Sequence, residues 1–214
     1  MNQNTRVVYL IRHGETVYNK ESIFRGRADI PLNENGRKQA LTTALKLKGL
    51  GIEAIFSSPL KRSIETADII SSEIGAPVTQ CVSFQNIDVG EWQAKAKADV
   101  QKQYPDLWRK WLSTPEDLLI PGGKMISDVR ERAVAGLRDL IGNDQTPGVF
   151  AIVSHRSVFK CLIAGLLGMN APYFWKLRLD NCSISTLEHS PESGFVLTSL
   201  NSTLGITDII IGDD

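Results

Sequence analysis

Short runs of apolar residues alternate along this chain with longer amphipathic segments. Residues 7–11 form the first run, which is β-branched and aromatic, and Gly14 allows a tight turn after it. Similar runs occupy residues 54–59 and 148–154. Short, continuously apolar runs of this kind are typical of buried strands in a parallel sheet.

The segments after these runs have apolar residues at helical spacing and end in glycine. The first follows Asn33, a good N-cap, and stops at Gly49. The expected helices span roughly residues 34–48, 60–74, 129–141 and 156–167. A strand that alternates with a helix predicts an α/β fold with a mostly parallel sheet.

Three other segments complete the predicted order of elements. Residues 77–84 are the candidate for a further strand, and residues 92–123, rich in Trp, Lys and Pro, are expected to leave the sheet. Residues 182–189 and 194–200 predict two antiparallel strands joined by a turn. A chain of 214 residues with this organisation fits one domain spanning residues 1–214.

Composition narrows the class of protein. The chain has 24 basic and 24 acidic side chains, so a surface for nucleic acid is not expected. Its three cysteines, Cys81, Cys161 and Cys182, lack a CxxC pair, which favours a reducing cytoplasm over a disulfide framework. Polar residues 1–4 do not match a signal peptide, and no apolar stretch is long enough for a membrane span. A homodimer remains open.

Two histidines follow apolar strands that should lie inside the same parallel sheet. His13 follows the first strand and His155 follows the run at 148–154. Because ligands of open α/β sheets bind at the carboxyl ends of the strands, the two imidazoles are expected to meet there. A neutral imidazole can attack phosphorus, and the guanidinium groups of Arg12 and Arg62 can stabilise the phosphoryl oxygens. No metal-ligand spacing accompanies these residues, so we expect chemistry without a metal or cofactor.

With these residues in view, the chain resembles the histidine phosphatase superfamily, the phosphoglycerate-mutase-like proteins with an Arg-His-Gly motif. That motif is Arg12, His13 and Gly14 here. Five blocks carry the resemblance in the family's order, at residues 10–19, 26–40, 57–67, 90–92 and 153–155. The resemblance covers almost the whole chain, and it implies a three-layer α/β/α sandwich.

The resemblance also implies an activity and a set of site residues. His13 would be phosphorylated in a pocket with Arg12, Arg62 and His155. Gly14, Glu15, Asn19, Arg25 and Arg156 are the expected substrate-binding residues. The compact chain is similar to the phosphatase branch, in particular to metal-independent phosphoserine phosphatases and α-ribazole phosphatases. This implies hydrolysis of a small phosphorylated metabolite, with phosphoglycerate mutase activity as the alternative.

One position departs from the family pattern in a way that bears on catalysis. Family members usually carry Glu or Asp as proton donor where this chain has Asn86. An amide cannot donate a catalytic proton as a carboxylic acid does. Asp88 is therefore a candidate acid, and Glu15 is a second one. The other interpretations are a weakly active or silent member that binds phosphorylated ligands, and an Asn introduced by design to hold an intermediate.

Two further departures add positive charge. Arg156 replaces a frequent Gly after the second histidine, and Lys124 falls in a block that is usually Gly-Glu-Ser. Near a phosphate pocket these residues would select a substrate with a second anionic group. The alternative is that both are solvated surface charges.

Overall fold

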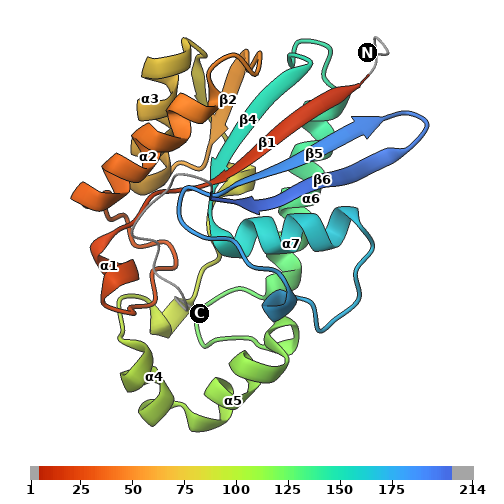
Figure 1. The fold of residues 1–214 in the computed structure, drawn as a ribbon. Coiled ribbons are helices and arrows are strands. Elements are labelled where there is room, and N and C mark those ends of the chain that lie inside the picture. Colours follow the sequence, from red (N-terminus) through yellow and green to blue (C-terminus); the bar gives the residue numbers. More distant parts are fainter. Residues whose placement is uncertain (1–4, 204–214) are drawn as a thin grey trace.

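The fold is built on one mixed sheet of six strands (Figure 1). The computed structural model describes residues 5–203, so the two ends of the predicted domain, including residues 1–4, lie outside the described residues. The strand order is β3-β2-β4-β1-β5-β6. The strands are β1 Arg6–Arg12, β2 Ala54–Ser57, β3 Val78–Gln80, β4 Val149–Ser154, β5 Ile184–Ser190 and β6 Gly194–Ser202.

The register of the central strands brings the two histidine corners together. β1 and β4 are parallel neighbours, with Val7 opposite Val149 and Arg12 opposite Ser154. Both strands therefore end at the same level, and the residues that follow them lie at one edge of the sheet. β5 pairs antiparallel with β1, and β6 pairs antiparallel with β5, so the predicted antiparallel pair is confirmed.

Helices cover both faces of this sheet. Val8 and Leu10 of β1 pack in the hydrophobic cluster that includes α6 and α7, whereas Ile11 packs in the cluster that includes α2 and α3. Successive residues of a strand point to opposite faces, so this alternation defines three layers. The helices are α1 Val17–Lys20, α2 Glu34–Leu47, α3 Lys61–Ile74, α4 Lys97–Gln103, α5 Pro105–Ser113, α6 Ile126–Gly142 and α7 Arg156–Leu166. The predicted α/β/α sandwich is confirmed.

The local signals explain most element boundaries. The side chain of Asn33 accepts a hydrogen bond from the backbone N–H of Gly36 and begins α2. Gly75 ends α3 in the left-handed region, at φ 77°. The strand predicted at residues 77–84 is shorter, because the chain turns after β3 into a 3₁₀ turn, Val82–Phe84, that buries Phe84.

Residues 92–123 leave the sheet as expected. α4 and α5 lie below the carboxyl edge of the central strands (Figure 1). Trp111 of α5 is at the centre of an aromatic cluster, with ring centroids 6.0 Å from Trp92, 5.6 Å from Phe174 and 5.2 Å from Trp175. None of the helices within residues 5–203 is long and apolar enough to cross a membrane.

Candidate active site

His13 is held rigidly at the carboxyl end of β1. Its backbone N–H donates to the carbonyl of Ser154 at 2.9 Å, and the side-chain amide of Asn181 donates to its carbonyl at 2.9 Å. The ring Nδ1 lies 2.7 Å from the carbonyl oxygen of Gly14. A carbonyl oxygen only accepts, so Nδ1 carries the proton and Nε2 carries the lone pair. The imidazole is therefore oriented as a nucleophile.

The electrostatic surroundings keep this imidazole neutral. His13 is 2% exposed. Burial, followed by the positive charges of Arg62 and Arg12, lowers the pKa of His13 well below its usual value. The lone pair on Nε2 is thus available at neutral pH.

Close backbone packing explains the two glycines beside the histidine. A Cβ on Gly14 would lie 2.5 Å from the carbonyl oxygen of Gly36, and a Cβ on Gly36 would lie 2.1 Å from the carbonyl oxygen of Glu15. Neither position has room for a side chain. The loop after β1 and the start of α2 are therefore packed backbone to backbone, which fixes the turn that carries His13.

His155 faces His13 from the corner between β4 and α7. The two rings meet edge to face with centroids 5.2 Å apart. Nε2 of His155 lies 2.7 Å from the Ser58 hydroxyl, while its Nδ1 is buried with no hydrogen-bond partner among the described residues. Burial, then the charges of Arg62 and His13, lowers the pKa of His155 well below its usual value. Because His155 lines the cavity described below, its Nδ1 is available to a ligand oxygen.

The two arginines are held by backbone carbonyls. Arg12 donates to the carbonyl of Leu179 at 2.7 Å. Arg62, which is completely buried, donates to the carbonyls of Ala28 at 2.7 Å and Gly26 at 3.0 Å. Burial and the nearby charge of Arg25 lower the pKa of Arg62 to about 9, so the guanidinium stays charged at neutral pH. Backbone carbonyls carry no net charge, so these hydrogen bonds do not neutralise the guanidinium groups. The arginines therefore keep a positive potential around the histidines.

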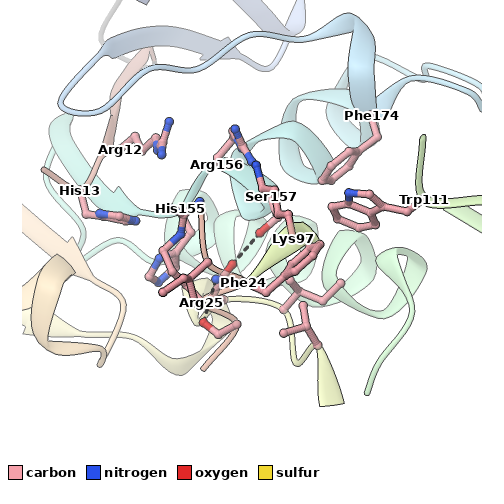
Figure 2. A pocket seen from close by; sticks show the side chains of 15 residues that line it. Arg12, His13, Phe24, Arg25, Lys97, Trp111, His155, Arg156, Ser157 and Phe174 are labelled. Atoms are coloured by element: carbon pink, nitrogen blue, oxygen red, sulfur yellow. Dashed lines mark hydrogen bonds between the residues drawn. The ribbon is translucent and has the colours of Figure 1, made fainter. Parts of the chain in front are cut away.

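Arg12, His13 and His155 line a cavity of about 60 Å³ at the carboxyl edge of the sheet, whereas Arg62 lies outside its lining (Figure 2). Arg12 and His13 lie on one side of it, Trp111 and Phe174 lie on the other, and Arg156 and Ser157 lie between them. The lining residues are Arg12, His13, Ile23, Phe24, Arg25, Gly26, Asn86, Ile87, Val89, Lys97, Trp111, His155, Arg156, Ser157 and Phe174. The described part of the lining contains four cationic side chains besides the histidines, and no carboxylate.

Asn86 lies in the lining with both ends of its amide engaged. Its Nδ2 donates to the carbonyl of Gly26 at 2.9 Å, and its Oδ1 accepts from the Ser157 hydroxyl at 2.5 Å. Figure 2 shows both bonds as dashed lines. The side chain is 7% exposed. The position at which relatives carry an acid thus faces the cavity here with a fixed amide.

The structure does not bring the two substitute acids to the cavity. Asp88 accepts from the backbone N–H of Gly90 at 3.0 Å and lies 3.6 Å from Arg27, in a separate surface depression that also contains Lys124. Glu15 is buried and accepts from the side-chain amides of Asn33 and Asn35. Neither carboxylate lines the cavity.

The other predicted substrate-binding residues divide into two groups. Arg25 and Arg156 line the cavity. Asn19 does not: its Oδ1 accepts from the backbone and hydroxyl of Thr16 and begins α1. Gly14 also lies outside the lining and donates its N–H to Thr66. These two residues shape the loop of His13.

Sequence reasoning missed several residues of the cavity. Lys97 begins α4, shortly after the block at residues 90–92, but it lies outside that block and no signal at its own position marks it. Ser157 follows the second histidine by two positions in the first turn of α7, and this proximity could have identified it. Ser58 belongs to a recognised block, and only the structure shows that it bonds His155.

The described residues do not form a cluster of metal ligands. Within residues 5–203 no three His, Cys, Asp or Glu side chains come together as metal ligands. The cationic groups around His13 and His155 are instead suited to an anionic ligand.

Comparison with known proteins places this geometry in a family. The model of the histidine phosphatase superfamily (branch 1) matches residues 8–203. The chain is 37% identical over 185 residues to "Probable phosphoglycerate mutase GpmB" of Cronobacter sakazakii, covering 85% of this chain and 84% of that one.

Solved structures with the same fold include two phosphatases. The α-ribazole phosphatase of Shigella flexneri superposes with a TM-score of 0.82 at 26% identity, covering 92% of this chain and 96% of that one. A phosphoserine phosphatase mutant of Entamoeba histolytica, in complex with phosphoserine, gives 0.82 at 30% identity, covering 93% and 98%. The expected resemblance is confirmed, and the chain belongs to branch 1 of the histidine phosphatase superfamily.

Proposed function

We propose that this chain hydrolyses phosphomonoesters of small metabolites through a phosphohistidine on His13. The observation that carries the proposal is the bond from Nδ1–H of His13 to the Gly14 carbonyl, which leaves the Nε2 lone pair inside a buried cationic site. The phosphatases of similar fold support the same reaction.

The reaction has two steps. Nε2 of His13 bonds to phosphorus while the bond from phosphorus to the leaving oxygen breaks. The guanidinium groups of Arg12 and Arg62 stabilise the charge on the phosphoryl oxygens, and Nδ1 of His155 is available to the same group. Water then adds to phosphorus, the P–N bond breaks, and its electron pair returns to Nε2. Inorganic phosphate leaves with both protons of the water.

We propose that no metal ion takes part. Phosphoryl transfer needs positive charge around the equatorial oxygens, and in this proposal the guanidinium groups of Arg12 and Arg62 supply it, while neutral His155 contributes a hydrogen bond. Activity that survives an excess of chelator supports this assignment. Location in the cytoplasm is a further proposal, which fits the free thiols of Cys81, Cys161 and Cys182.

The first prediction tests the nucleophile. His13→Ala removes the proposed nucleophile, so p-nitrophenyl phosphate turnover should fall at least about 10³-fold. Acid-quenched wild-type protein should carry an acid-labile phosphoryl group on His13 after mixing with substrate. His189→Ala is the matched control, because His189 lies on the β5–β6 hairpin, away from the cavity. Normal turnover in folded His13→Ala protein would contradict the proposal.

A second candidate function is suggested by the relatives named phosphoglycerate mutase. A mutase returns the phosphoryl group from His13 to another hydroxyl instead of to water. Incubation of 3-phosphoglycerate with a catalytic amount of the 2,3-bisphosphate distinguishes the two activities. Net formation of 2-phosphoglycerate without release of phosphate identifies a mutase, and release of phosphate identifies a phosphatase.

A further inference from the structure

No carboxylic acid that could protonate a leaving oxygen lines the described part of the cavity. A phosphatase that releases an alkoxide needs a general acid, which is typically worth about 10²- to 10⁴-fold in rate. Asn86 occupies the position at which the family resemblance implies an acid. The carboxylates of Asp88 and Glu15 accept hydrogen bonds from groups outside the cavity lining. The Ser157 hydroxyl is too weak an acid to replace a carboxyl group, and it donates to Asn86.

The amide of Asn86 is also fixed in one orientation. Its Nδ2 donates to the carbonyl of Gly26, and its Oδ1 accepts from Ser157. Reversing the amide would place its NH₂ group against a hydroxyl and its oxygen against a carbonyl oxygen, and would lose the bond to Gly26. The group at position 86 is therefore a neutral amide, and this amide does not ionise at any physiological pH.

Cationic side chains lie in the same cavity beyond those that surround His13. Arg25, Lys97 and Arg156 line it together with Arg12, while Arg62, outside the lining, acts on His13 through its charge. One phosphate does not need five cations. The additional charges suit a leaving group that is itself an anion.

The far side of the cavity is apolar and aromatic. Phe24, Trp111 and Phe174 line it, with Phe24 and Trp111 centroids 5.7 Å apart and Trp111 and Phe174 centroids 5.6 Å apart. These rings are suited to pack against an organic group that is attached to the anionic leaving group.

We propose that the preferred substrate is an organic diphosphate, from which the enzyme removes the terminal phosphoryl group. The inference rests on the proposed phosphohistidine chemistry and differs from it in the preferred bond, which is a phosphoanhydride in place of a phosphomonoester. The terminal phosphate binds at His13, the inner phosphate binds among Arg25, Lys97 and Arg156, and the organic group packs on the aromatic side. A phosphate leaving group is a far weaker base than an alkoxide, so its departure needs no proton donor.

The transfer step balances without an acid. Nε2 of neutral His13 bonds to the terminal phosphorus, and the anhydride P–O bond breaks. Its electron pair stays on the bridging oxygen, which leaves as part of an organic monophosphate dianion. Water then hydrolyses the phosphohistidine as described above, so the net products are an organic monophosphate and inorganic phosphate.

The test compares a diphosphate and a monophosphate of the same alkyl group, with an aryl phosphate as a reference. Wild-type kcat is measured with 2-phenylethyl diphosphate, 2-phenylethyl phosphate and p-nitrophenyl phosphate. The diphosphate and the nitrophenyl ester should be turned over at least about 100-fold faster than the alkyl monophosphate, because only the last needs a proton donor. Asn86→Glu should raise turnover of the alkyl monophosphate at least about tenfold and leave the diphosphate unimproved. Asn86→Gln is the control and should not raise it.

The outcomes separate this inference from the proposed function. If wild-type enzyme hydrolyses the alkyl monophosphate as fast as the diphosphate, and His13→Ala abolishes both, the inference is wrong and the phosphohistidine mechanism stands. If none of the three compounds is hydrolysed and His13 takes up no phosphoryl group, the proposed function fails and the inference fails with it. The wild-type ratio decides the matter even if a variant at position 86 does not fold.

A second measurement tests the site of the inner phosphate. Arg156→Ala should raise KM for the diphosphate about tenfold and change KM for p-nitrophenyl phosphate less than about twofold, since only the diphosphate loses a charge-assisted hydrogen bond to its inner phosphate. Lys124→Ala is the matched control, because Lys124 lies in the separate depression with Asp88. Equal increases with both substrates would overturn the assignment of Arg156 to the inner phosphate.

Discussion

The two sides of the cavity are constructed in different ways. We define the phosphoryl side as Arg12, His13 and His155, which line the cavity, together with Arg62, which lies outside the lining. These residues lie at strand ends or at the start of a helix, and backbone carbonyls hold the side chains of Arg12, His13 and Arg62. The leaving-group side, defined as Asn86, Arg156 and Ser157, comes from a loop and a helix start, and a bond between two side chains joins Asn86 to Ser157.

This difference indicates which part of the chemistry can change during evolution. A backbone carbonyl is present whatever the residue, so the phosphoryl side keeps its geometry as long as the fold is kept. A contact between two side chains changes with one substitution. A substitution at position 86 is therefore expected to alter the leaving groups that can be released and to leave the phosphoryl side intact.

Among variants that keep His13, the largest expected effect comes from the phosphoryl side. Arg62→Met removes a buried guanidinium that acts on whatever phosphoryl group is bound, so kcat/KM should fall about 10²- to 10³-fold with every substrate. Arg37→Met is the control, since Arg37 is an exposed residue paired with Glu65. A loss of kcat/KM that depends strongly on the leaving group would contradict the separate roles of the two sides.

A smaller effect is expected when the support of His155 is removed. Ser58→Ala deletes the hydroxyl that lies 2.7 Å from Nε2 of His155. A hydrogen bond of this kind contributes about 1 kcal/mol, so kcat should fall roughly fivefold to tenfold while KM changes little. Ser72→Ala, on the exposed side of α3, is the matched control. Unchanged kcat in Ser58→Ala would show that this contact does not position the imidazole.

The smallest effect on activity is expected from mild acid. Burial and the arginine charges hold the pKa of His13 below its usual value, so its neutral form persists when the pH is lowered from 7.5 to 6. The rate kcat/KM for p-nitrophenyl phosphate, corrected for ionisation of the substrate, should therefore stay nearly constant over this range. A decrease that follows an ordinary histidine titration near pH 6.5 would contradict the assigned environment.

Stability should respond to the same acid more than activity does. The pKa values of His13 and His155 are lowered in the folded protein, so the unfolded chain binds more protons below about pH 6.5. The free energy of unfolding should fall as pH falls from about 6.5 toward the folded-state pKa values. Denaturant titrations of wild-type protein and of the double variant His13→Asn, His155→Asn measure this, and the dependence should be weaker in the variant.

Most of the fold could be predicted from local signals. The runs that form β1 and β4, the cap at Asn33 and the terminating Gly75 act within a few residues, and the structure follows them. The end of β3 could not be predicted in this way. Phe84 turns into a core made by residues distant in sequence, and that packing outweighs the local preference for a longer strand.

The candidate site divides along the same line. His13, His155 and their arginines are marked by motifs at strand ends, so their meeting could be expected from the sequence. The positions of Asp88 and Glu15 could not, because their partners, Arg27 and the side chains of Asn33 and Asn35, decide which way each carboxylate points. Lys97 is brought in by α4, and no signal at its own position indicates a role.

The sequence by itself determined the family and the layered sheet and predicted the nucleophile, because strand patterns and short motifs depend on neighbouring residues. Only the tertiary structure decided which groups share the cavity. It placed Asn86 in the lining, turned both candidate acids away, and added Arg25, Lys97 and Arg156 to the same space. The direction of a side chain depends on partners from elsewhere in the chain, and this chain reveals those partners only when it is folded.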